Sequence, residues 1–215
     1  MTIDLANVAS QPSSTRSGPR ARARAVTAEN TVLERLKRET EVEHEAVEGA
    51  TGVLDRALSL EGYRAYLERT FGFYLIVEQQ LRGLGVWEAL RLPATAREKL
   101  PLLAEDLVLL GNLEPASIRA CDAPPQFASI AEAVGGAYVL EGSTLGGRVM
   151  LRHIQRLFGP HVAHAFLEGY GANTGKKWQS FRAALERFAR SREIEDRMIA
   201  GAQETFHSFT RWLTR

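Results

Sequence analysis

Apolar residues recur at steps of three and four through most of the chain from Thr31 onward, which is the pattern of amphipathic helices. The first such segment covers about residues 31–49, and the same spacing predicts helices over about 60–83 and 95–110. On the first helix, one stripe of positions consists of Leu33, Leu36, Thr40, His44 and Val47.

The second half of the chain begins with a proline-containing loop over about 111–127. Four further helices are predicted, over about 128–158, 161–168, 174–190 and 193–212. We find no convincing strand alternation and no internal repeat. The pattern therefore predicts an all-α, single-domain bundle of about seven helices.

The helix predicted over 128–158 contains an unusual cluster of glycines. Gly142, Gly146 and Gly147 lie within six residues, and two more glycines lie just upstream. Each glycine inside a helix costs roughly 1 kcal/mol relative to alanine, so three cost about 3 kcal/mol. That is a large share of a domain stability of roughly 5–15 kcal/mol. Either the backbone must approach a ligand closely, or another helix must pack unusually near.

An alternative interpretation makes this cluster a phosphate-binding loop that follows a strand over 137–141. The spacing Gly142-x-x-x-Gly146-Gly147 matches neither the dinucleotide fingerprint nor the P-loop, and no Lys-Ser/Thr pair follows it. Nothing else in the sequence supplies a parallel sheet. The helical interpretation is favoured.

Composition narrows the class of protein. With 215 residues, 45% of them hydrophobic, the chain is long and apolar enough for a globular core. Lys plus Arg (27) balances Asp plus Glu (26), which gives no general case for a nucleic-acid partner. The single cysteine, Cys121, excludes a disulfide framework and favours a reducing, cytoplasmic compartment. No apolar run approaches the roughly 18–20 residues of a membrane span.

The first 28 residues differ from the rest in composition. They are rich in Ser, Pro, Arg and Ala, which predicts a disordered tail over 1–28 followed by one domain over 29–215.

His44 is the second feature that points to chemistry. Steps of four place Leu36, Thr40 and His44 on one line of the first helix, so the imidazole is expected to point inward. Glu48 follows four residues later, where its carboxylate can orient a metal-ligating imidazole. On this helix alone, a core histidine satisfied by its neighbours is the favoured interpretation. Lys37 lies on the same side and is placed to meet an anionic group at the rim.

One inward imidazole without a cysteine or a second inward histidine nearby cannot build a four-coordinate zinc site. It is sufficient for haem, which brings its other ligands and is held by a single proximal histidine. Bare glycine backbone on the opposite face would leave room for a small gas. The glycine cluster and His44 together therefore suggest a haem pocket.

Two segments resemble the haem oxygenase family. Residues 36–44, continued to Glu48, resemble the proximal helix of that family, and residues 138–147 resemble its distal helix in the bacterial biliverdin-producing form. The region from Gly169 to Phe181 is also similar, so the resemblance covers roughly residues 30–213. It implies oxidative opening of haem to biliverdin, iron and carbon monoxide, with O2 and external electrons.

The resemblance also implies residue roles. His44 would be the axial ligand of the haem iron, with Glu48 as its hydrogen-bond partner, and Gly142 and Gly146 would pass over the distal face. The other residues expected to bind haem are Tyr138, Lys37 at a propionate, Lys177 and Arg182 in the region of further propionate contacts, and Phe206 at the haem edge.

One position departs from the family pattern. In the animal members, the residue after the first distal glycine is an aspartate that orders a water network, whereas this chain has Ser143. A hydroxyl can donate and accept hydrogen bonds but carries no charge. Whether Ser143 orders the water is therefore the question that this departure raises. The chain also lacks the C-terminal membrane anchor of the animal members, which is consistent with a soluble enzyme.

The expected partners follow from the resemblance. They are haem, O2 and an electron donor, either a ferredoxin or a flavoprotein reductase. A photoreceptor that takes biliverdin as its chromophore is a candidate consumer of the product, and iron acquisition is the competing role. Two other interpretations are a haem carrier or sensor without turnover, and a helical bundle that binds no haem.

Overall fold

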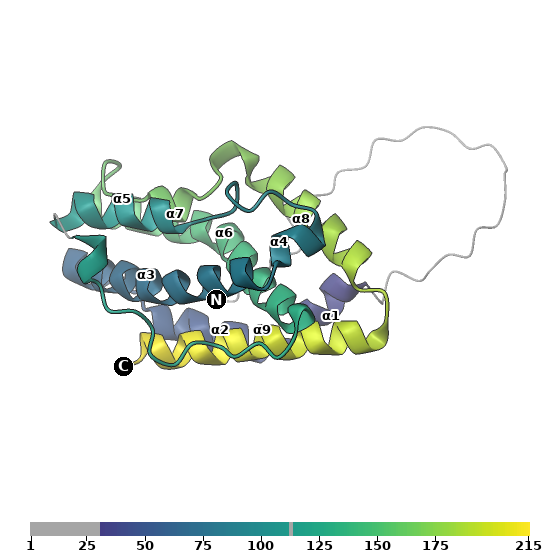
Figure 1. The fold of residues 1–215 in the computed structure, drawn as a ribbon. Helices are drawn as coiled ribbons and strands as arrows, with labels where there is room; N and C mark the ends of the chain where they lie inside the picture. Colours follow the sequence, from purple (N-terminus) through teal and green to yellow (C-terminus); the bar gives the residue numbers. More distant parts are fainter. Residues whose placement is uncertain (1–30, 112–113) are drawn as a thin grey trace, which may run out of the picture.

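The structure is a computed structural model that describes residues 31–111 and 114–215 (Figure 1). This part of the chain forms nine α-helices and two short 3-10 turns, with no strand. The tail predicted over 1–28 lies outside the described residues. The α-helices are α1 (Val32–Glu39), α2 (Glu41–Thr51), α3 (Leu60–Gly83), α4 (Val86–Leu90), α5 (Leu100–Gly111), α6 (Ile130–Phe158), α7 (Ala165–Glu168), α8 (Thr174–Phe188) and α9 (Arg192–Leu213).

Serine caps begin the three longest helices. Ser59, Ser129 and Ser191 precede α3, α6 and α9, and each hydroxyl accepts a hydrogen bond from the backbone N–H three residues later. Such a cap satisfies one of the donors that a helix start leaves unpaired. At the other end, Gly159 terminates α6 with a φ of 91°, which a residue with a side chain rarely adopts. The long helices therefore begin and end where local chemistry predicts.

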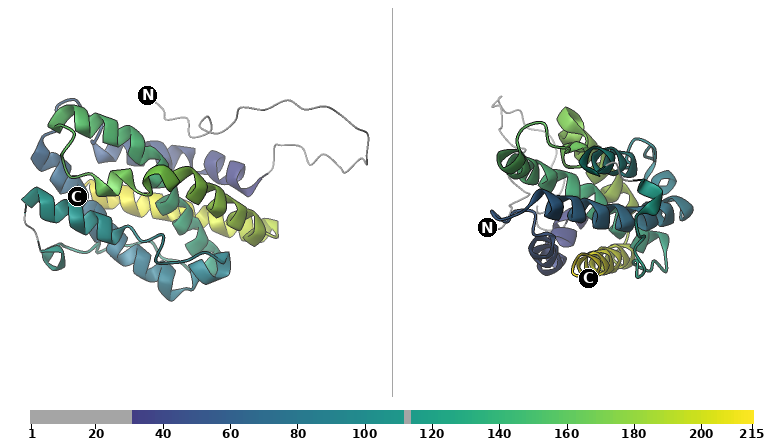
Figure 2. Two further views of the ribbon diagram at one scale, coloured as in Figure 1. Left: turned by 90° about the horizontal axis from the view of Figure 1, so that it is seen from above. Right: turned by 90° about the vertical axis from the view of Figure 1, so that its left-hand side faces the viewer.

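The crossing of α6 and α9 lies at the centre of the fold (Figures 1 and 2). A methyl group added to Gly135 would overlap the backbone carbonyl of Met198 on α9. Reciprocally, a methyl on Gly201 of α9 would overlap the carbonyl of Glu132 on α6. The two backbones are thus in direct contact, which only glycine permits. Helix α3 completes the core through the stacked rings of Phe73 and Phe209, whose centroids are 4.5 Å apart.

The first predicted helix is two helices in the structure. Thr40 breaks it with φ −123° and ψ 14°, and its hydroxyl donates to the Leu36 carbonyl at 2.7 Å. A threonine that bonds to its own backbone competes with the helical hydrogen bonds. The same side chain lies close to the hydroxyl of Tyr138 on α6. This tertiary contact holds the break, and periodicity along one segment does not reveal it.

Three other boundaries differ from the prediction. The five-residue α4 was not predicted, because the left-handed residues Gly85 and Arg91 isolate it at both ends. The helix predicted over 95–110 begins at Leu100, since residues 91–99 form a loop that turns two cationic side chains inward. Of the helix predicted over 161–168, only residues 165–168 are helical, and they form α7.

Residues 137–141 are helical, which contradicts the alternative of a strand followed by a phosphate loop. Helix α6 continues without interruption through the whole glycine cluster. None of the described helices combines the length and apolar character needed to span a membrane.

Candidate functional site

Helices α2 and α6 are connected at two points. Near the start of α2, the Thr40 side chain lies close to the hydroxyl of Tyr138 on α6. Beyond the end of α2, the carbonyl of Asp55 bonds with Nε2 of His153, also on α6, at 2.9 Å. Burial raises the pKa of Tyr138 to about 12, so its hydroxyl stays protonated and can donate. Contacts with α6 are therefore made at the residue before α2 and in the segment that follows α2.

The residues predicted to lie on the two faces of the haem are reached by counting four residues at a time from Thr40 and from Tyr138. Along α2, one step from Thr40 reaches His44 and a second reaches Glu48. Along α6, one step from Tyr138 reaches Gly142 and a second reaches Gly146. Residues four apart lie on the same side of a helix. His44 and Gly142 are thus each one turn from a shared contact, on two connected helices.

His44 is held from two sides. Its Nδ1 lies 3.6 Å from a carboxylate oxygen of Glu48, and its ring meets the ring of Phe206 on α9 edge to face at 5.8 Å. The His44 side chain is 33% exposed, and α2 has no fully buried residue. The imidazole is therefore half-buried, and it is not enclosed in the core as the alternative interpretation of this helix would require. Because Nδ1 faces Glu48, Nε2 is the nitrogen left available to a ligand.

The glycines of α6 fall into two groups. Methyl groups on Gly135, Gly136 and Gly147 would meet α9, Phe127 and the Leu167 carbonyl respectively, so these three permit close packing. Methyl groups on Gly142 and Gly146 would meet no atom within 4 Å. We call Gly142 and Gly146 the glycine face. Close packing therefore explains the first three glycines, whereas the open space at Gly142 and Gly146 is compatible with a ligand that approaches the backbone.

Ser143 is hydrogen-bonded within the protein. Its hydroxyl donates to the Leu140 carbonyl at 2.8 Å and lies 2.9 Å from the hydroxyl of Tyr74 on α3. Since the serine proton is used, Tyr74 is the donor in the second bond. Burial raises the pKa of Tyr74 well above its usual value, which keeps this donor protonated. Tyr74 was not predicted as a site residue, because an aromatic residue at helical spacing normally indicates packing in the core.

The predicted propionate-binding residues are distributed over two helices. Lys37 is exposed on α1, and Arg182 is exposed on α8. Lys177 is half-buried: its ammonium donates to the Ala96 carbonyl at 2.9 Å and lies 5.3 Å over the ring of Tyr170. Burial, and next the nearby Arg97, lower the pKa of Lys177. The structure thus joins Lys177 to a buried charge cluster, and no described contact joins these three residues to His44.

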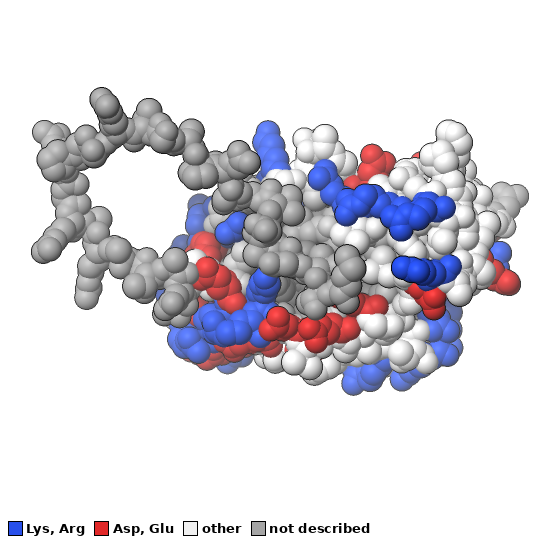
Figure 3. All heavy atoms as spheres, turned by 180° about the vertical axis from the view of Figure 1, so that it is seen from behind, with Lys and Arg blue, Asp and Glu red and all other residues white. Residues whose placement is uncertain are grey.

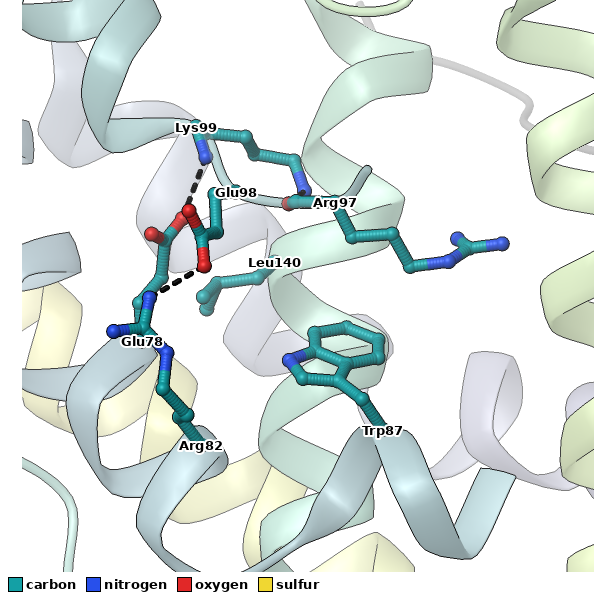
Figure 4. Close-up of a pocket in the computed structure, with 7 residues that line it drawn as sticks. All are labelled: Glu78, Arg82, Trp87, Arg97, Glu98, Lys99 and Leu140. Atoms are coloured by element: carbon teal, nitrogen blue, oxygen red, sulfur yellow. Dashed lines mark hydrogen bonds and ion pairs between the residues drawn. The ribbon is translucent and has the colours of Figure 1, made fainter. Parts of the chain in front are cut away.

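That cluster lies against α6 and centres on Glu141, which is 1% exposed. Its carboxylate forms an ion pair with Arg97, accepts a hydrogen bond from Lys99 Nζ at 2.8 Å and accepts another from the Tyr170 hydroxyl at 2.7 Å. On the adjoining side, the Lys99 amide donates to Glu78 at 2.8 Å (Figure 4). Burial raises the pKa of the Glu78 carboxyl. No local pattern of residues predicts this cluster.

A small cavity of about 10 Å³ borders the cluster and has room for about one water molecule (Figure 4). It is far too small for haem, and none of the residues predicted to bind haem lines it.

The donor set around α2 and α6 suits haem. Among residues 31–111 and 114–215, no group of three or more His, Cys, Asp or Glu side chains could hold a bare metal ion. One imidazole nitrogen with an oriented second nitrogen fits a metal that arrives with its own ligands. The glycine face, where a Cβ would have free space around it, fits the close approach of a flat group.

Comparisons with known proteins agree with this reading. The family described as Heme oxygenase matches residues 30–215. A curated heme oxygenase from Xanthomonas campestris pv. campestris is 38% identical over 114 residues, which are 53% of this chain and 66% of that protein. The alignment therefore spans just under two thirds of that relative.

Solved structures give the same fold. The NO- and CO-bound heme oxygenase from Neisseria meningitidis is 25% identical with a TM-score of 0.72, covering 85% of this chain and 90% of that one. The heme oxygenase from Leptospira interrogans is 17% identical with a TM-score of 0.71, covering 86% and 99%. Heme oxygenase-1 from the cyanobacterium Synechocystis, in complex with heme, is 14% identical with a TM-score of 0.69, covering 85% and 90%. At the last two identities the likeness shows the fold alone.

The all-α fold and the resemblance stated from the sequence are thus confirmed. The chain belongs to the haem oxygenase family.

Proposed function

We propose that this protein binds haem between α2 and α6 and opens it oxidatively to biliverdin, ferrous iron and carbon monoxide, using O2 and electrons from an external donor. Bound haem would supply the iron at which oxygen reacts and would itself be the substrate. The observation that carries the proposal is the pairing of His44 on α2 with the glycine face on α6, since residues on either side of α2 contact α6.

On the proximal side, His44 would bind the iron through Nε2. Glu48 lies 3.6 Å from Nδ1, which favours the tautomer that leaves Nε2 unprotonated. The edge of Phe206 limits rotation of the imidazole. Lys37, Lys177 and Arg182 remain the proposed propionate partners, and for Lys177 this would require exchange of its bond to the Ala96 carbonyl.

On the distal side, Gly142 and Gly146 would let the backbone of α6 approach the haem face, with Tyr138 at one end. Ser143 accepts a hydrogen bond from Tyr74 and keeps a second lone pair on its exposed side, where a water molecule can donate. We propose that Tyr74 and Ser143 together take the place of the carboxylate found in the animal members, by holding water next to the glycine face.

Haem titration followed by turnover tests this function. Added haem should give a Soret band at a ratio of one to one, and ascorbate with oxygen should replace that band with the spectrum of biliverdin. His44→Ala should retain the helical content but lose the axial bond and the turnover. A haem complex that stays intact under these conditions would instead identify a carrier or sensor, and the absence of any Soret band would rule out both.

The electron donor is proposed to be an acidic ferredoxin or flavoprotein reductase. Arg148, Arg152 and Arg156 are exposed at successive turns of α6, and in the described part of the chain none of them forms an ion pair. Seen from behind, the surface has a band of Lys and Arg side chains with few acidic neighbours (Figure 3). Turnover with such a donor should fall steeply with salt, and Arg152→Glu should weaken it without affecting turnover driven by ascorbate.

We also propose a cytoplasmic location, supported by the single buried cysteine, and leave a biliverdin-accepting photoreceptor as a candidate consumer. HPLC of the bilin formed in cells that carry such a photoreceptor, with and without this protein, would test that link.

A further inference from the structure

Apart from Lys177 at its edge, the buried charge cluster has no part in the chemistry described above, yet it contacts α6 next to the glycine face. Its central residue, Glu141, directly precedes Gly142 in the sequence. Successive residues of an α-helix are about 100° apart around the axis. Glu141 and Ser143 therefore lie about 100° to either side of Gly142, and each is tied to a different part of the protein.

The contacts that hold Ser143 and Glu141 differ in strength. Ser143 is held by one hydrogen bond from Tyr74. Glu141 is held by Arg97 and Lys99 from the loop before α5 and by Tyr170 from the segment after α7. The loop is itself fixed, because Lys99 Nζ also donates to the Arg97 carbonyl at 3.0 Å. Breaking one side of a buried ion pair leaves an uncompensated charge, so the Glu141 side resists movement far more than the Ser143 side.

We propose that Glu141 is a positioning residue that fixes the rotation of α6 about its own axis and thereby aims the glycine face at the haem. The proposal rests on the proposed function. A Cα atom lies about 2.3 Å from the helix axis, so a rotation of about 20° would shift Gly142 by about 0.8 Å. A misplacement of about 1 Å at a reacting centre can change rates by about 100-fold. A rotation that small would therefore alter which meso carbon lies next to the open backbone.

Glu141→Gln is the central variant, since it removes the charge and keeps the shape. Tyr170→Phe is a milder variant that removes one donor to the same carboxylate and leaves both ion pairs. Glu195→Gln is the matched control, because Glu195 forms an ion pair with buried Arg35 between α9 and α1, away from the Glu141 cluster. All three should bind haem one to one.

Two readouts are compared. In the haem-free protein, amide exchange over residues 142–147 should be at least fivefold faster in Glu141→Gln than in wild type. After turnover with ascorbate, the ratio of biliverdin isomers separated by HPLC should change at least threefold. Tyr170→Phe should change the exchange rate and the isomer ratio in the same direction but by less. Glu195→Gln should change neither quantity. If Glu141→Gln fails to fold, Tyr170→Phe decides.

Unchanged exchange and isomer ratio in the Glu141 and Tyr170 variants would overturn the proposal. Equal changes in Glu195→Gln would also overturn it, because they would reflect general destabilisation. If the wild-type protein forms no bilin, the proposed function fails, whereas the exchange comparison still tests the rotation of α6.

Discussion

Helix α6 contains glycines of two kinds. Gly135, Gly136 and Gly147 pack against neighbouring elements, whereas Gly142 and Gly146 form the open glycine face. At Gly135 the backbone of α9 occupies the position of a side chain, whereas at Gly142 that position has no atom within 4 Å. The first glycine is required by the fold, and the second is explained by what approaches from outside the chain. A cluster of glycines in a helix should therefore be divided by what a methyl group would meet before it is called a site.

Gly135→Ala should give the largest change in stability. A methyl group would overlap the Met198 carbonyl at the centre of the crossing of α6 and α9, and neither backbone can move away easily. We expect a loss of about 3 kcal/mol in the free energy of unfolding. Urea denaturation followed by circular dichroism would measure it. A variant as stable as wild type would contradict the division of the glycines.

Gly147→Ala should have an intermediate effect. The ideal Cβ lies 2.6 Å from the Leu167 carbonyl oxygen, which is also backbone. However, Leu167 belongs to α7, a helix of four residues that can shift more easily than α9. We expect a loss of about 1.5 kcal/mol by the same measurement. A loss larger than that of Gly135→Ala would show that α7 is the more rigid neighbour.

Tyr74→Phe tests the boundary between the packed and open sides of α6. It removes the hydrogen bond to Ser143 and should lower the free energy of unfolding by about 1 kcal/mol. If Tyr74 and Ser143 hold the water, turnover should also fall severalfold while haem affinity stays the same. Tyr66→Phe, another buried tyrosine of α3, is the control and should leave turnover unaffected.

Gly142→Ala and Gly146→Ala should change stability least, and in the opposite direction. Alanine favours a helix by up to about 1 kcal/mol over glycine, and no clash opposes it here. Turnover should nevertheless fall at least tenfold, because the methyl group would occupy the space reserved for the ligand. Gly175→Ala on α8 is the matched control: it also meets open space and should gain stability without loss of turnover.

The sequence was sufficient for the parts of the site that depend on one helix. The spacing of four between His44 and Glu48 correctly predicts their proximity, and the bounds of α3, α6, α8 and α9 follow within two residues from periodicity and caps. The split at Thr40 was missed, because the contact that holds it comes from Tyr138, almost 100 residues later.

Residues that act through long-range contacts could not be predicted. Arg97 and Lys99 lie in an irregular loop, where two cationic side chains normally indicate a solvated surface, and yet both are buried against Glu141. Likewise, nothing local distinguishes Gly135 from Gly142, since their difference lies in whether α9 crosses at that turn. Packing between helices decides both cases.

The break at Thr40 also gives α2 a pivot. Helix α1 is anchored by Arg35, whose guanidinium pairs with Glu195 and Asp196 at the start of α9. Helix α2 begins immediately after the pivot and is 11 residues long, or about 16 Å at 1.5 Å per residue. His44 is only four residues, or about 6 Å, from Thr40.

A tilt of α2 about Thr40 would therefore move its far end nearly three times as far as it moves His44. Such a tilt is opposed beyond that end by Val53, which is fully buried in the core, and by the bond between His153 and the Asp55 carbonyl. Because this end is held in the core, any residual tilt of α2 shifts His44 by only about a third as much, which keeps the imidazole in a fixed position relative to α6.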